Sequence, residues 1–87
     1  MAVQSFRVTL VGADFTDASD DADRVLERCD DVLLSHEPAG NVATFDREAT
    51  SFAAAVGSAL ADLEVALPHA QVVLVEPAPL GTLSVAS

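Results

Sequence analysis

Apolar and polar residues follow two different periods along this chain. Four short segments either alternate with a period of two or are continuously apolar, as β-strands are. Two longer segments repeat apolar residues every three or four positions, as amphipathic helices do. The expected strands cover residues 6–11, 32–36, 41–46 and 71–76, and the expected helices cover residues 18–29 and 51–67. The elements therefore follow one another as strand, helix, strand, strand, helix, strand.

This order predicts an architecture. Two right-handed strand–helix–strand units fused in this way give the ferredoxin-like βαββαβ fold, an α+β fold in which a four-stranded antiparallel sheet carries two helices on one face. One domain over residues 1–79 accounts for the pattern, and residues 80–87 form a C-terminal tail, a swapped arm or an added edge strand. The expected core between sheet and helices contains Phe6, Val8, Phe45, Val56 and Leu60.

The other face of such a sheet has no helix to cover it. The last strand is apolar on both sides, which is typical of a central strand or of a covered outer face. An open face with this much apolar surface is expected to be buried by self-association. The residues expected to form this interface are Arg7, Thr9, Thr44, Val72 and Leu74.

The second helix has a further face made of small residues. Ala53, Gly57 and Ala61 are spaced by four, a pattern that allows another element to approach the backbone closely. Glycine inside a helix costs about 1 kcal/mol relative to alanine, so Gly57 is expected to have a packing role. Two partners remain open: a neighbouring loop of the same chain, or a helix-mediated contact between chains.

Arg47 stands between two carboxylates, Asp46 and Glu48, just before the second helix. One interpretation is a local ion-pair clasp that fixes the turn from strand to helix. The other is that Arg47 is a contact offered to a carboxylate of a partner protein.

The charge of the chain excludes several partners. The chain has fourteen acidic residues, four arginines and no lysine, so its net charge is −10. Nucleic-acid binding needs lysine or arginine near phosphates, and an anionic membrane surface would repel this chain. No apolar run approaches the roughly 20 residues that cross a bilayer, and no leader segment is recognisable, so a cytoplasmic location is expected.

Candidate chemistry is sparse. Cys29 is the only cysteine, which excludes an internal disulfide, and its place on an apolar helix face predicts a buried thiol. His36 and His69 lack partners at metal-binding spacing, and the aspartates of residues 14–23 lack the calcium-loop pattern. No phosphate-binding or nucleophile motif is present. Acylphosphatase-like chemistry would need an anion-attracting loop where Asp14 stands. We therefore expect that the protein is not an enzyme and that it binds no cofactor or metal ion.

Several short strings carry a resemblance to a known family. They are Cys29-Asp30-Asp31, Phe45-Asp46-Arg47-Glu48-Ala49, Ser51-Phe52, Ala55-Val56, Ser58-Ala59, Asp62 with Glu64, Val72-Val73 and Val75-Glu76-Pro77. With them the chain resembles the N-terminal domain of small helix-turn-helix proteins of high-GC Gram-positive bacteria. Residues 80–83 resemble the opening of the helix-turn-helix, which is itself absent. The resemblance implies the regulatory or assembly half of such a protein.

The expected function is a non-enzymatic, homodimerising protein-interaction or regulatory module, whose partners are a second copy and another protein. The alternative is a small-ligand sensor of the amino-acid type. That alternative depends on the end of the first strand, where Val11-Gly12 followed by Asp14 is loosely similar to amino-acid-binding regulatory domains of the same fold.

Overall fold

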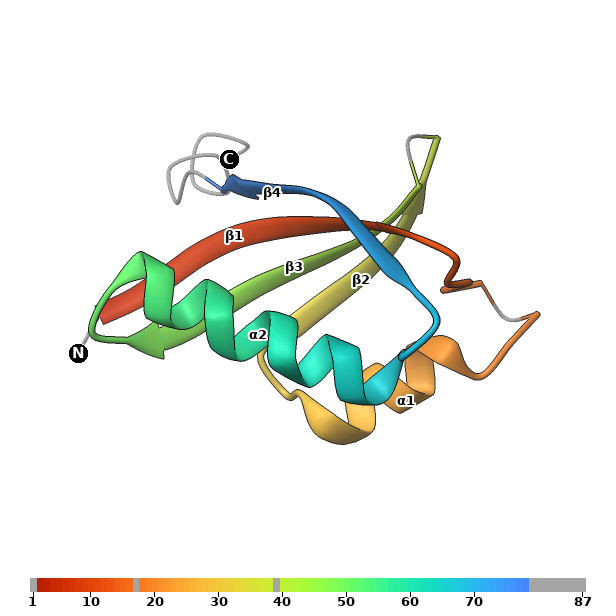
Figure 1. Ribbon diagram of the computed structural model, residues 1–87, viewed down its shortest axis with the longest axis horizontal. Coiled ribbons are helices and arrows are strands. Elements are labelled where there is room, and N and C mark those ends of the chain that lie inside the picture. Colours follow the sequence, from red (N-terminus) through yellow and green to blue (C-terminus); the bar gives the residue numbers. More distant parts are fainter. Residues whose placement is uncertain (1, 17, 39, 79–87) are drawn as a thin grey trace, which may run out of the picture.

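The computed structural model describes residues 2–16, 18–38 and 40–78 (Figure 1). Its elements are β1 (Ala2–Val11), α1 (Asp21–Arg28), β2 (Val32–Glu37), β3 (Gly40–Ala49), α2 (Phe52–Ala66) and β4 (Gln71–Pro77). The strands form one antiparallel sheet in the order β2-β3-β1-β4. The expected α+β class, with a four-stranded antiparallel sheet and two helices, is confirmed.

The core lies between the sheet and the helices, which pack beside each other on the same side (Figure 1). Alternation along β1 and β3 places Phe6 opposite Phe45, and their rings stack with centroids 5.3 Å apart. Val25 of α1 and Leu63 of α2 close the core from the helices. Burial of each such side chain stabilises the fold by about 1.5–3 kcal/mol. The prediction for Phe6, Val8 and Phe45 is confirmed, whereas Val56 and Leu60 are only partly buried at the margin.

Helix α1 begins at Asp21, three residues later than the periodicity predicted. The residues before it are held in a loop by side chains: the Ser19 hydroxyl donates to the Asp14 carbonyl at 2.7 Å, and the Asp14 amide donates to the Asp21 carboxylate at 3.0 Å. Polar side chains that bond their own backbone favour such a loop over another helical turn. Helix α2 starts as expected, because the Ser51 hydroxyl accepts the Ala54 amide at 3.1 Å.

Strand β4 lies at one edge of the sheet, which excludes the central position, one of the two alternatives that its apolar character left open. Its pairing with β1 shifts between Thr9 and Leu10, so that Leu74 lies opposite Thr9 but Val72 lies opposite Leu10. Residues directly opposite each other in an antiparallel pair share a face. Val72 and Leu74 therefore do not share the open face, contrary to the sequence pattern. The expected tail or edge strand over residues 80–87 lies outside the described residues.

Candidate functional site

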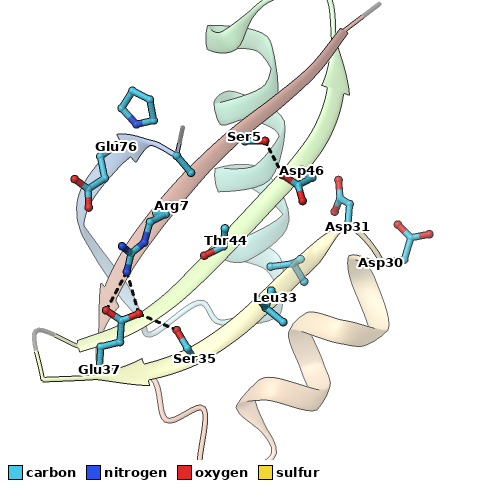
Figure 2. A pocket seen from close by; sticks show the side chains of 13 residues that line it. Ser5, Arg7, Asp30, Asp31, Leu33, Ser35, Glu37, Thr44, Asp46 and Glu76 are labelled. Carbon is cyan, nitrogen blue, oxygen red and sulfur yellow. Dashed lines mark hydrogen bonds and ion pairs between the residues drawn. The ribbon is translucent and has the colours of Figure 1, made fainter. Parts of the chain in front are cut away.

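A groove of about 750 Å³ crosses the face of the sheet that carries no helix (Figure 2). All four strands or the residues next to them contribute to its lining. One side is formed by the residues that lead into β2, and the other by the end of β4. Its charged lining residues are Arg7, Asp30, Asp31, Glu37, Asp46 and Glu76.

An ion pair lies at one end of the groove, next to the hairpin between β2 and β3 (Figure 2). Nη2 of Arg7 in β1 lies 2.9 Å from each carboxylate oxygen of Glu37 at the end of β2, and the Ser35 hydroxyl donates to the same carboxylate at 3.1 Å. Because β3 lies between β1 and β2, this pair spans β3 (Figure 2). The two side chains are 37% and 41% exposed, so water screens their attraction and the pair contributes about 0.2–1 kcal/mol.

The position of Glu37 depends on the glycine that opens β3. Glu37 pairs with Gly40, whose φ of 139° is strongly disfavoured for other residues. A Cβ atom at Gly40 would also stand 2.8 Å from the carbonyl oxygen of Leu10. Glycine at this position therefore lets the hairpin close and bring Glu37 toward Arg7.

The groove carries more negative than positive charge. Five of its lining residues are carboxylates and one is an arginine, which gives a formal balance of −4. Asp46 accepts a hydrogen bond from the Ser5 hydroxyl at 2.6 Å, whereas Asp30 and Glu76 form no ion pair within the described ranges. Carboxylates around a concavity focus their field into it, so the groove attracts cations.

Arg47 lies on the opposite, helix-covered face of the sheet. Its Nε and Nη2 atoms bind the Asp31 carboxylate at 2.8 and 3.0 Å, and Nη1 lies 3.0 Å from Asp62 and 3.1 Å from the Ser58 hydroxyl. The guanidinium also stands over the Phe45 ring, 5.0 Å from its centroid. With its side chain only 13% exposed, Arg47 joins β3 to α2 and to the segment before β2.

The expected clasp of Arg47 with Asp46 and Glu48 is therefore wrong. Residues 46–48 continue strand β3, and alternation sends both carboxylates to the face opposite Arg47. The hydrogen bonds from Arg47 hold the pKa of Asp31 below its ordinary value, and the Asp31 carboxylate in turn raises the pKa of Arg47. Two carboxylates of the same chain, Asp31 and Asp62, already bind the Arg47 guanidinium. A contact between Arg47 and a carboxylate of a partner protein stays a prediction.

Cys29 packs against the same cluster. Its sulfur lies 3.7 Å from Nη2 of Arg47 and 3.8 Å from a carboxylate oxygen of Asp62. The thiol is buried, as the helical pattern predicted. Burial raises the pKa of the Cys29 thiol, with the Asp62 charge adding to the effect against the opposing Arg47 hydrogen bond. The protonated, unreactive thiol is thus favoured.

The expected interface residues on the open face divide into two groups. Arg7 and Thr44 line the groove, while Thr9 is buried at 6% exposure. Beside them, three consecutive residues of β4 leave apolar surface in water: Val72 at 38%, Val73 at 53% and Leu74 at 49% exposure. We call these three residues the β4 strip. The open face is thus polar around the groove, and its exposed apolar surface is less continuous than the sequence suggested.

The small-residue face of α2 points to solvent. Ala53, Gly57 and Ala61 are all exposed, and a Cβ atom added at Gly57 would meet nothing within 4 Å. Packing of this face beneath a loop of the described chain is therefore wrong. A contact between chains through α2 stays a prediction.

Comparison with known proteins identifies no relative of this chain. The chain matches no protein-family model, no curated protein and no solved structure. Among the described residues, no group of three or more histidine, cysteine, aspartate or glutamate side chains is arranged to hold a metal ion. In the same part of the chain, no helix has the length and apolar character needed to cross a membrane.

Sequence reasoning missed several residues of the groove. The expected strand ends at residue 36 and so leaves out Glu37, although alternation along β2 puts Leu33, Ser35 and Glu37 on one face, which was the available signal. Glu76 was missed because continuous apolar residues in β4 gave no alternation from which to infer its face.

Asn41 was also missed as a structural residue. It is buried, its Oδ1 accepts the Phe15 amide at 3.1 Å and lies 2.9 Å from Nδ1 of His36, and its amide nitrogen donates to the Ala13 carbonyl. Asn41 thus anchors the loop between β1 and α1 to the sheet. Phe15 and Ala13 lie 26 and 28 residues away, so no local pattern indicated these two partners.

Proposed function

We propose that this protein is a non-enzymatic interaction module that forms a homodimer through the β4 strip. The observation that carries the proposal is the strip itself: Val72, Val73 and Leu74 stand exposed at an edge of the sheet. Val72 and Leu74 lie on opposite faces of this edge with Val73 between them, and exposed apolar side chains gathered at one edge favour association. The groove and the β4 strip are distinct surfaces, so a dimer leaves a second site for another protein.

Side-chain packing, rather than extension of the sheet, supports this contact better. Pro77 has no amide hydrogen to offer to another strand, and the register shift near Val73 interrupts the regular edge. The strip itself is uncharged. In an antiparallel two-fold contact centred on the β4 strip, the two copies of Glu76 lie at opposite ends of the interface. The two chains, each with a net charge of −10, therefore repel each other little at the contact itself.

The fold assignment belongs to the same proposal. We assign the ferredoxin-like βαββαβ fold, which the element order and the strand order β2-β3-β1-β4 support. The relationship to the N-terminal domain of helix-turn-helix proteins is proposed on its sequence strings alone. It is compatible with an assembly role and adds no nucleic-acid contact.

Sedimentation velocity of the wild type and Leu74→Asp tests the dimer. We expect a wild-type dimer at high micromolar concentration and a folded monomer for Leu74→Asp, because an unpaired carboxylate buried in an interface costs several kcal/mol. Leu33→Asp is the matched control, since Leu33 is 72% exposed on the opposite edge strand and should leave the dimer intact. A monomeric wild type at that concentration would refute the dimer.

A small-ligand sensor of the amino-acid type is the second candidate, and the groove favours it. Arg7 can meet a carboxylate, and Asp46 or Glu76 can meet an ammonium group, which is the charge pattern of a zwitterion. A thermal-shift screen with the common amino acids tests this candidate, because a ligand at 100 times its Kd stabilises the folded protein by about 2.7 kcal/mol. No shift with any of them would exclude it.

A further inference from the structure

We propose that the groove on the open face of the sheet binds a lysine- or arginine-bearing segment of a partner protein. The inference rests on the proposed interaction role and names the chemistry of that second partner. It does not require the dimer, because the groove lies within one chain.

Charge complementarity is the first argument. The formal balance of the lining is −4, and its single arginine is already held by both oxygens of Glu37. Arg7 therefore opposes an incoming cation far less than a free guanidinium would. Asp31 is paired with Arg47, which lies outside the lining, so the unpaired negative charge belongs to Asp30, Asp46 and Glu76. Asp30 and Glu76 are exposed and have no ion-pair partner among the described residues, so they remain available to a cation from outside.

The shape of the groove is the second argument. Its acidic ends are separated by the width of the sheet: Glu76 belongs to the β4 edge, and Asp30 precedes β2 at the other edge. Neighbouring strands lie about 4.8 Å apart, so the two edges are about 14 Å apart, and Asp30 is offset from the level of Glu76 by three residues, or up to about 10 Å, along the strands. The two ends are therefore about 17 Å apart, which four residues of extended peptide, about 13 Å long, cover with the added reach of two long basic side chains. Two basic residues four positions apart can therefore reach both ends together.

An apolar contact distinguishes a peptide from a simple polycation. Leu33 is 72% exposed, the largest exposure among the large apolar side chains of the described chain, and it lines the groove. An apolar side chain between two basic residues would cover it. A linear polyamine has amines at suitable spacing but no side chain to place on Leu33.

Fluorescence anisotropy with a labelled Lys-Ala-Leu-Ala-Lys peptide tests the proposal on the full chain. We expect saturable binding to the wild type that weakens at least tenfold in the double variant Asp46→Asn, Glu76→Gln. Asp46→Asn keeps an acceptor for the Ser5 hydroxyl, which protects the fold. Glu76→Gln alone, at an exposed edge position, should weaken binding several-fold and serves if the double variant does not fold.

The matched control is Asp23→Asn, Glu27→Gln, which removes the same charge from the exposed surface of α1. We expect its binding to stay within twofold of wild type. Equal weakening by the two double variants would show that net charge alone attracts the peptide and would overturn the proposal. So would failure of the wild type to bind, or equally tight binding of spermidine, which would indicate a small-polycation site.

Two readouts separate this proposal from the proposed dimer. Asp46→Asn, Glu76→Gln should sediment as the wild type does, and Leu74→Asp should still bind the peptide. Loss of the dimer with retained peptide binding would refute only the contact through the β4 strip. A dimer that binds no peptide would refute only the partner named here.

Discussion

Two arginines of the same sheet, Arg7 and Arg47, differ in how far they are buried and in which elements they join. Both bind a carboxylate through more than one contact, yet Arg7 and Glu37 are 37% and 41% exposed, whereas Arg47 is 13% exposed between two carboxylates. Arg7 links strands within the sheet layer, while Arg47 ties the sheet to a helix and to the segment before β2. The comparison teaches that burial and the number of joined elements decide whether an ion pair stabilises the fold or remains available to a partner.

We expect the largest loss of stability from replacing Arg47, the more buried of the two arginines. Arg47→Met leaves Asp31 without its partner and keeps only Arg28, at 3.1 Å, beside Asp62. We expect the free energy of unfolding to fall by about 2–4 kcal/mol, somewhat below the usual cost for fully buried pairs because both carboxylates retain some contact with water. Urea unfolding followed by circular dichroism measures the change.

Arg24→Met is the control for that loss. Arg24 is exposed and pairs at 3.5 Å with Asp20, the N-cap residue of α1, so its removal should change stability by no more than about 0.5 kcal/mol. Equal losses in the two variants would mean that the Arg47 cluster behaves as a surface pair.

The pH dependence of stability tests the pairing of Asp31 with Arg47. Because hydrogen bonds from Arg47 lower the pKa of Asp31 in the folded protein, ionised Asp31 adds stability above the ordinary aspartate pKa of 3.8, and that stability is lost as the pH falls through the lowered value. Asp31→Asn should be less stable than wild type at pH 7, and the difference should shrink in acid. Unfolding curves between pH 7 and about pH 2 measure it.

Some acid sensitivity will remain in Asp31→Asn. The pKa of Asp14 is also lowered, by hydrogen bonds from the Thr16 hydroxyl and amide, and this carboxylate is unaffected by the substitution. A wild-type advantage that stays constant from neutral to acidic pH would contradict the assigned role of Asp31.

The two arginines also show what could be predicted from the sequence. Alternation placed Phe6 and Phe45 in the core, and helical periodicity found α2 within one residue of each end. The partners of Arg47 could not be found in this way, because Asp31 and Asp62 lie 16 and 15 residues away and meet it only after the layers pack.

The part of the open face that β4 forms escaped prediction for a different physical reason. Continuous valine and leucine in β4 give no alternation, so nothing in the pattern marks the register shift that separates Val72 from Leu74. The groove could be predicted only if the faces of all four strands were assigned together, and an error in β4 alone was enough to hide Glu76.

We expect the smallest effect at the exposed pair of Arg7 and Glu37, and its size decides whether this pair differs from the Arg47 cluster. In a double-mutant cycle of Arg7→Gln and Glu37→Gln, we expect a coupling energy of about 0.2–1 kcal/mol at low ionic strength, because both side chains are more than one-third exposed. That coupling should shrink as salt screens the charges, whereas the coupling between Arg47 and Asp31 should be larger and change less. Urea unfolding of the four proteins in each cycle gives both energies. A coupling of Arg7 to Glu37 above about 2 kcal/mol would make it a structural pair like Arg47. Arg7 and Glu37 would then stay paired when a cation enters the groove, and the cation would be recognised by Asp30, Asp46 and Glu76.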